Sequence, residues 1–146
     1  MIEVRRTSTA PPDAVWNVLA DGWYYPVWVV GAARMRAVSA DWPAVGAELH
    51  HSVGGWPFLL DDIRRATKSV PGRELVLRGR GWPASEVEVQ VVLEPTADGG
   101  REIVMREDAV AGPARLTPYP LRAPLIFQRN TESVRRLAYL AERPAP

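Results

Sequence analysis

The segment from Tyr119 to Arg143 carries the sequence pattern that most constrains how this chain can fold. At 100° per residue, its apolar residues gather on one side of a helix and most of its charged residues on the other. We therefore expect one long amphipathic helix, whose apolar side must lie against another layer of the structure. The expected buried side consists of Ala123, Phe127, Asn130, Val134, Leu137, Ala138 and Ala141, and the expected solvent side of Gln128, Arg129, Glu132, Arg136, Tyr139 and Arg143.

The residues before this helix predict mostly short strands. Ile2 to Thr9 begins with alternating apolar and polar side chains, as a half-buried strand does. Pro11-Pro12-Asp13 then begins a short helix, and the segment Trp23–Val30, interrupted by Pro26, predicts one or two further helical turns. Further strands are expected at residues 33–40, 48–53, 59–70, 74–82, 86–94 and around 103–109. These elements predict an α+β fold, in which a curved antiparallel sheet of about seven strands wraps around the long helix and leaves a space beside it.

The composition is that of a globular protein, and the length fits one domain spanning residues 1–146. A net charge of +1 provides no strong field for nucleic acid or an acidic membrane, and no apolar run is long enough to span a bilayer. The first residues lack the apolar stretch of a secretory signal, and the absence of cysteine excludes disulfides and thiolate metal sites. We expect a cytoplasmic monomer or homodimer with no nucleic-acid partner, no stable membrane association and no cofactor.

Four short motifs accompany this order of elements. They are Ala10-Pro11-Pro12-Asp13-Ala14-Val15-Trp16, Leu19-Ala20-Asp21 with Trp28 downstream, Pro71-Gly72-Arg73, and Asn130-Thr131-Glu132 in the last helix. On these motifs the whole chain resembles the helix-grip fold of the START-like (SRPBCC) superfamily, and it is most similar to the polyketide cyclase/dehydrase members. The resemblance implies an internal apolar cavity for a small hydrophobic molecule that is polyketide-, lipid- or isoprenoid-like. It implies no shared catalytic motif.

Two residues are candidates for acid–base chemistry in such a cavity. His51 shares the strand face of Leu49 and Val53, and a neutral imidazole there can act as a general base. Glu107 shares the face of Met105, where burial would raise the pKa of a carboxyl group. The alternatives are a hydrogen-bonded structural histidine and a bulge that turns Glu107 toward solvent. No Asp or Glu stands at metal-ligand spacing from the histidines, so we expect no metal site.

Charged residues in two strands form a second group of candidates. Asp61-Asp62 and Arg64-Arg65 each place one side chain on either face of their strand, and we select Asp62 and Arg80 as ligand-binding candidates. An arginine that faces a dry cavity needs a partner, which Glu107, Asp62 or a ligand carboxylate can provide. The alternative is an outer, solvated face with ordinary ion pairs.

Aromatic residues and one amide complete the candidate ligand site. Six tryptophans are many for a chain of this length, and aromatic side chains from loops and strand ends suit the mouth of a pocket. Ordinary core packing is the alternative for each of them. The candidates are Trp23, Trp28, Trp56, Trp82, Tyr119 and Phe127, together with Asn130, the one polar residue on the expected buried side of the last helix.

Three functions are compatible with these observations. The preferred one is binding of a small hydrophobic or aromatic ligand in an internal cavity. The second is a polyketide cyclase or dehydratase that uses His51, Glu107 and one arginine. The third is a ligand-free interaction protein with a filled core, which would contact a partner through Trp23–Val30.

Overall fold

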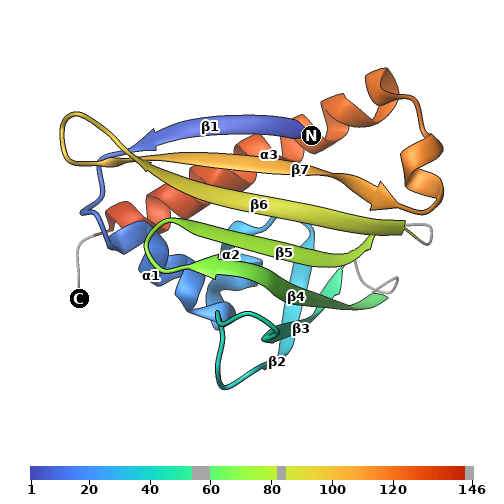
Figure 1. Cartoon of the computed structure of the whole chain (residues 1–146), viewed down its shortest axis with the longest axis horizontal. Coiled ribbons are helices and arrows are strands. Elements are labelled where there is room, and N and C mark those ends of the chain that lie inside the picture. Colours follow the sequence, from blue (N-terminus) through green and yellow to red (C-terminus); the bar gives the residue numbers. More distant parts are fainter. Residues whose placement is uncertain (54–59, 82–84, 144–146) are drawn as a thin grey trace.

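The computed structural model describes residues 1–53, 60–81 and 85–143. Within these ranges, seven strands form one curved antiparallel sheet that packs against a long C-terminal helix (Figure 1). This arrangement confirms the predicted α+β helix-grip architecture. In chain order the elements are β1 (Ile2–Ser8), α1 (Ala14–Ala20), the 3-10 turn η1 (Gly22–Tyr24), α2 (Tyr25–Trp28), β2 (Ala32–Val38), β3 (Glu48–Val53), β4 (Leu60–Val70), β5 (Glu74–Gly81), β6 (Ser85–Pro95), β7 (Arg101–Ala111), the 3-10 turn η2 (Pro113–Leu116) and α3 (Tyr119–Glu142).

The strand order in the sheet is β1-β7-β6-β5-β4-β3-β2. Strands β2 to β7 therefore pair with their sequence neighbours, and β1 joins the far edge beside β7. Helix α3 contacts β1, β7, α1 and α2, so the two ends of the chain pack together over the same face of the sheet. No helix in the described ranges is long and apolar enough to cross a bilayer.

The inner face of the sheet carries the apolar core. Alternate residues of the strands point toward α3, as the period of two in a strand requires. On β6, Val89, Val91 and Leu93 are buried, in agreement with the alternation of the sequence. They pack in one cluster with Val134 and Leu137 of α3.

Only the second half of α3 is buried as expected. Asn130, Val134 and Leu137 are buried, whereas Phe127 is 52% exposed, so the prediction that Phe127 belongs to the buried side is wrong. In Figure 1 the first turns of α3 lie beyond the start of β1, so the sheet does not cover them. The helical period gives the direction of a side chain but not the length of the layer opposite.

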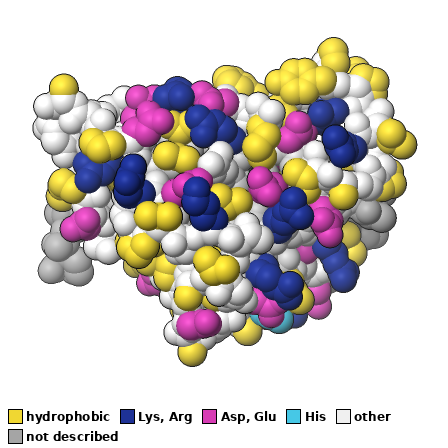
Figure 2. Space-filling view, in the orientation of Figure 1, with side chains coloured by type: hydrophobic (Ala, Val, Ile, Leu, Met, Phe, Trp, Pro, Cys, Tyr) yellow, Lys and Arg dark blue, Asp and Glu magenta, His cyan; other side chains and the backbone are white. Residues whose placement is uncertain are grey.

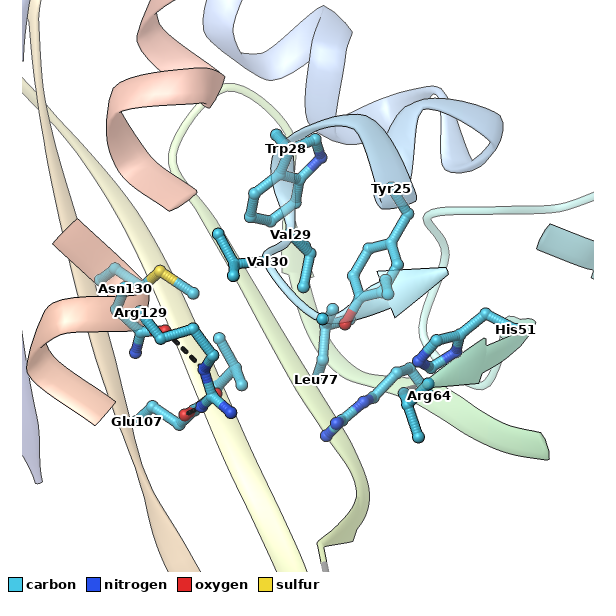
Figure 3. A pocket seen from close by; sticks show the side chains of 15 residues that line it. Tyr25, Trp28, Val29, Val30, His51, Arg64, Leu77, Glu107, Arg129 and Asn130 are labelled. Atoms are coloured by element: carbon cyan, nitrogen blue, oxygen red, sulfur yellow. Dashed lines mark hydrogen bonds and ion pairs between the residues drawn. The ribbon is translucent and has the colours of Figure 1, made fainter. Parts of the chain in front are cut away.

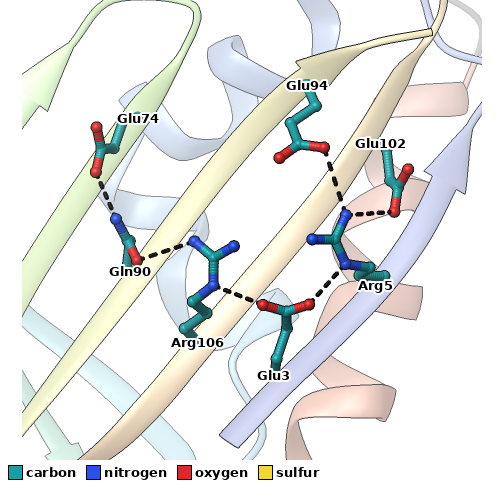
Figure 4. Close-up of polar contacts among 7 residues, drawn as sticks. All are labelled: Glu3, Arg5, Glu74, Gln90, Glu94, Glu102 and Arg106. Atoms are coloured by element: carbon teal, nitrogen blue, oxygen red, sulfur yellow. Dashed lines mark hydrogen bonds and ion pairs between the residues drawn. The ribbon is translucent and has the colours of Figure 1, made fainter. Parts of the chain in front are cut away.

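The outer face of the sheet carries positive and negative side chains interspersed with apolar ones (Figure 2), and several of the charged residues pair across strands (Figure 4). Glu3 of β1 accepts hydrogen bonds from Arg5 Nε and from Arg106 Nε of β7, each at 2.6 Å. Such partly exposed pairs keep this face in contact with water and contribute little stability individually. The network consists of Glu3, Arg5, Glu74, Gln90, Glu94, Glu102 and Arg106.

Candidate functional site

A cavity of about 220 Å³ lies between the inner face of the sheet, the segment around α2, and α3 (Figure 3). Its size is below the roughly 300–1,000 Å³ typical of drug-sized ligand pockets, so a small molecule fits it best. The apolar walls are formed by Trp28, Val29, Val30, Leu77, Val89 and Met105. The polar groups in the lining are Tyr25, His51, Arg64, Glu107, Arg129 and Asn130.

Local sequence explains why these side chains meet. His51 lies on β3 with the same parity as Leu49, whose side chain is fully buried in the core. Glu107 continues the inward face of β7 after Ile103 and Met105. Asn130 is the first buried residue of α3 after its exposed amino-terminal turns.

The segment that closes the cavity opposite the sheet is short and fixed at several points. Pro26 lies in the first turn of α2, where its missing N–H removes no helical hydrogen bond. The backbone N–H of Val30 donates to Ser133 Oγ of α3 at 3.1 Å. The rings of Tyr25 and Trp28 pack edge to face, with centroids 5.6 Å apart. Trp28 is thereby held with its indole against the cavity.

Glu107 and Arg129 form an ion pair at the side of the cavity next to α3 (Figure 3). The Arg129 Nε also lies 3.5 Å from Asn130 Oδ1. Burial is the main reason that the pKa of Arg129 is lowered, and the nearby positive charge of Arg64 adds to the effect. Arg129 is partly exposed, as predicted for the polar side of the helix, and its long side chain also reaches over the cavity.

Arg64 extends from β4 into the middle of the cavity wall. Its side chain is 13% exposed, and its Nε lies 3.4 Å from Asp62 Oδ2. It lies across Gly79 of β5, where a methyl group would come within 2.7 Å of Arg64 Nε and Nη1. Among the described residues, neither Nε nor Nη1 has a hydrogen-bond partner. The Arg64 guanidinium thus lines the cavity and has N–H groups that donate no hydrogen bond within the described part of the protein.

His51 is neutral in the folded protein at pH 7. Burial, followed by the positive charge of Arg64, lowers its pKa from 6.5 to about 4. Its Nε2 lies 3.9 Å from Asp62 Oδ2, which is too long for a hydrogen bond, and its ring packs edge to face on Tyr25. Within the described ranges, His51 Nδ1 has no partner. Burial likewise raises the pKa of the Tyr25 hydroxyl, so that it stays protonated.

A sequence comparison identifies the family of the chain. The family model described as "Polyketide cyclase / dehydrase and lipid transport" matches residues 1–142. The chain belongs to this family. No curated protein matches it.

Several solved structures share the fold of this protein over nearly the whole length of its chain. Protein CV1439 from Chromobacterium violaceum has a TM-score of 0.72 and 18% identity over 98% of both chains. The di-domain ARO/CYC StfQ from the steffimycin biosynthetic pathway has a TM-score of 0.75 and 13% identity over 96% of this chain and 49% of that one. Ara h 8.0201 has a TM-score of 0.69 and 13% identity over 97% of both. At these identities the likeness shows the fold, and with the family match it confirms the predicted START-like (SRPBCC) superfamily.

Four of the predicted site residues of this polyketide cyclase/dehydrase family member line the cavity. They are Trp28, His51, Glu107 and Asn130. Asp62 is buried directly behind them, where it contacts Arg64 without lining the space.

Other predicted residues lie elsewhere. Trp23, Tyr119 and Phe127 are exposed and outside the cavity, because η1 and the first turns of α3 are not covered by the sheet. Arg80 is exposed on the opposite face of β5, since Leu75 and Leu77 take the inward positions, and only its backbone N–H contacts Asp62 Oδ1, at 3.3 Å. Trp56 and Trp82 lie outside the described residues.

Sequence reasoning missed Arg64, Arg129 and Tyr25 as lining residues. A signal for an arginine was present, because a carboxylate on the apolar face of β7 needs a cation beside it. The sequence did not say which arginine reaches it. Among the described residues, no three His, Asp or Glu side chains come together as a metal site would require.

Proposed function

We propose that this protein binds a small hydrophobic or aromatic molecule in the cavity between its sheet and α3, as a cytoplasmic binding protein. The observation that carries the proposal is the partly open cavity of about 220 Å³ between an apolar wall and a polar one. An apolar ligand body would lie against Trp28 and Met105, and polar groups at the other end would fix its orientation. The structural likeness to StfQ, from the steffimycin biosynthetic pathway, supports a polyketide-like aromatic as one such ligand.

Two features favour binding over acid–base catalysis. His51, with a pKa of about 4, is a weak base at neutral pH, far from the value at which general bases work best. The carboxylate of Glu107 is already engaged in an ion pair with Arg129.

One observation keeps a cyclase or dehydratase as a second candidate. The free donors of Arg64 would stabilise an enolate oxygen that develops in the cavity. In that case wild-type protein converts the bound compound, and His51→Gln or Glu107→Gln slows the conversion while the compound still binds. The interaction-module hypothesis assumed a filled core, and the cavity counts against it.

The decisive experiment combines identification and titration. Mass spectrometry of natively purified and then denatured protein detects any small molecule that leaves on unfolding. Calorimetric titration with 2-naphthamide, a flat neutral two-ring probe, measures saturable binding with one site per chain. Val30→Phe is the matched control, because Val30 points into the cavity and a phenyl ring there fills it (Figure 3). Absence of binding by wild-type protein, or equal binding by Val30→Phe, would refute the proposal.

A further inference from the structure

We propose that the natural ligand is a planar apolar molecule that carries a carboxylate, and that this carboxylate binds at the Arg64 guanidinium. The inference rests on the proposed binding function and narrows it to one chemical class. Three observations carry it: unpartnered donors in the lining, the placement of Asp62 on one side of Arg64 only, and the way in which β5 makes room for Arg64.

The cavity lining contains buried polar nitrogens that have no hydrogen-bond partner. Among the described residues, Arg64 Nη1, His51 Nδ1 and Asn130 Nδ2 are buried without a hydrogen-bond partner. His51 and Asn130 are each only 1% exposed, so bulk water does not reach them. Buried donors left unpaired are costly, and native proteins almost always satisfy them. An ionised carboxylate consists of acceptors only and complements this set.

Among the residues that line the cavity itself, two are cations and one is an anion. Arg64 and Arg129 face the cavity together with a single carboxylate, Glu107, which is already paired with Arg129. Behind the lining, the carboxylate of Asp62 lies 3.4 Å from Arg64 Nε, and it is the only carboxylate among the described residues within salt-bridge distance of Arg64. Asp62 is turned partly away from Arg64, since its Oδ1 accepts the backbone N–H groups of Ile63 and Arg80. Asp62 thus reaches only the Nε side of Arg64, and a negative ligand group would provide the acceptor that Arg64 Nη1 lacks.

The backbone of β5 is shaped around Arg64. Gly79 has an ordinary negative φ, so it is not required there by its conformation. A side chain at Gly79 would instead occupy the space of the Arg64 guanidinium. The glycine thus leaves Arg64 lying flat on the sheet with its end in the cavity, opposite the apolar wall that contains Trp28 (Figure 3). The cavity thus has a cationic side at Arg64 and an aromatic side at Trp28. A planar aromatic molecule with a carboxylate at one end would match both sides.

The test compares two probes of the same shape. At pH 7, 2-naphthoate carries a carboxylate and 2-naphthamide a neutral amide on the same two rings. Calorimetric titration of wild-type protein should show naphthoate binding at least about tenfold more tightly, as expected for a charge-assisted bond to a buried arginine. In Arg64→Met, which keeps much of the side-chain volume, the two affinities should become equal. Arg78→Met, on the outer face of β5, should behave as wild type.

The results distinguish failure of the carboxylate inference from failure of the proposed binding function. Equal affinities of both probes for wild-type protein, or tighter binding of naphthamide, would overturn the carboxylate inference and leave the binding function intact. A preference for naphthoate that persists in Arg64→Met would overturn the assignment to Arg64. If neither probe binds, the proposed function fails and the inference falls with it. The wild-type comparison uses no variant, so it remains decisive even if Arg64→Met does not fold.

Discussion

Arg129 of α3 forms an ion pair with Glu107 of β7 in which the two partners are unequally buried. The side chain of Arg129 is 42% exposed, whereas that of Glu107 is 6% exposed. The arginine can therefore reach water if its partner is lost, but the carboxylate cannot. The pair closes one side of the cavity, so its energetics bear on both stability and ligand access.

The unequal burial predicts unequal costs for removing each partner. Arg129→Met leaves a buried carboxylate without its cation and should destabilise the protein by about 2–4 kcal/mol. Glu107→Gln leaves an arginine that can turn toward solvent and should cost about 1 kcal/mol or less. Urea unfolding of both variants at pH 7 measures the difference. Equal losses, or a greater loss in Glu107→Gln, would contradict this account.

His51 predicts how stability changes in mild acid. Its folded-state pKa of about 4 lies below the ordinary value of 6.5, so between these values the unfolded chain binds the proton more tightly. Stability should therefore fall as pH decreases through this window, by about 2 kcal/mol between pH 7 and pH 5 from His51 alone. Urea unfolding of wild type and His51→Gln at both pH values isolates this contribution. Wild-type protein should lose more stability than the variant, and parallel losses would show that His51 does not carry the effect.

Gly79→Ala should act on the ligand site through Arg64. The new methyl group would collide with the Arg64 side chain, which is long enough to move aside. We expect naphthoate to bind several-fold more weakly, while the affinity for naphthamide and the urea midpoint change little. In an Arg64→Met background the same substitution should have no further effect on naphthoate, and a full additional loss would place the role of Gly79 elsewhere.

Tryptophan fluorescence should separate two of the sequence candidates. Trp28 is buried against the cavity, and Trp23 is 58% exposed outside it. An aromatic ligand in the cavity contacts the indole of Trp28 and should change its emission. Trp28→Phe should remove much of the ligand-dependent change, and Trp23→Phe should leave it intact. The reverse pattern would place the ligand near η1 instead.

The positions of His51, Glu107 and Asn130 could be predicted because strand and helix periods alone determine them. Leu49 and Met105 show which face of their strands points inward. His51 and Glu107, each two positions further along, point to the same face. The selection of Arg80 was wrong, because Leu75, Val76 and Leu77 are consecutive apolar residues whose alternation does not show which face of β5 is inward. Periodicity thus predicts the inward face of a strand where its apolar residues alternate with polar ones, and it fails where apolar residues stand on both faces.

The roles of Arg64 and Arg129 could not be predicted for a different reason. Periodicity places a Cβ atom, but a guanidinium lies several bonds further out and its position depends on packing. Arg129 begins on the exposed side of α3 and still reaches Glu107. The exposure of Phe127 likewise depends on where the sheet ends, a property of the assembled layers and not of the helix.

The polar side chains of β3 and β4 come from doublets in the sequence: His50-His51, Asp61-Asp62 and Arg64-Arg65. A shift of one residue in a strand exchanges its two faces. Here such a shift would bring the same residue types to the cavity, whereas Leu49 and Ala66, which have no such neighbour, would turn outward. A one-residue slip of either strand would therefore preserve the types of polar group at the cavity while disrupting the packing of the core. It is the buried Leu49 and Ala66, more than the polar doublets, that specify the register of these strands.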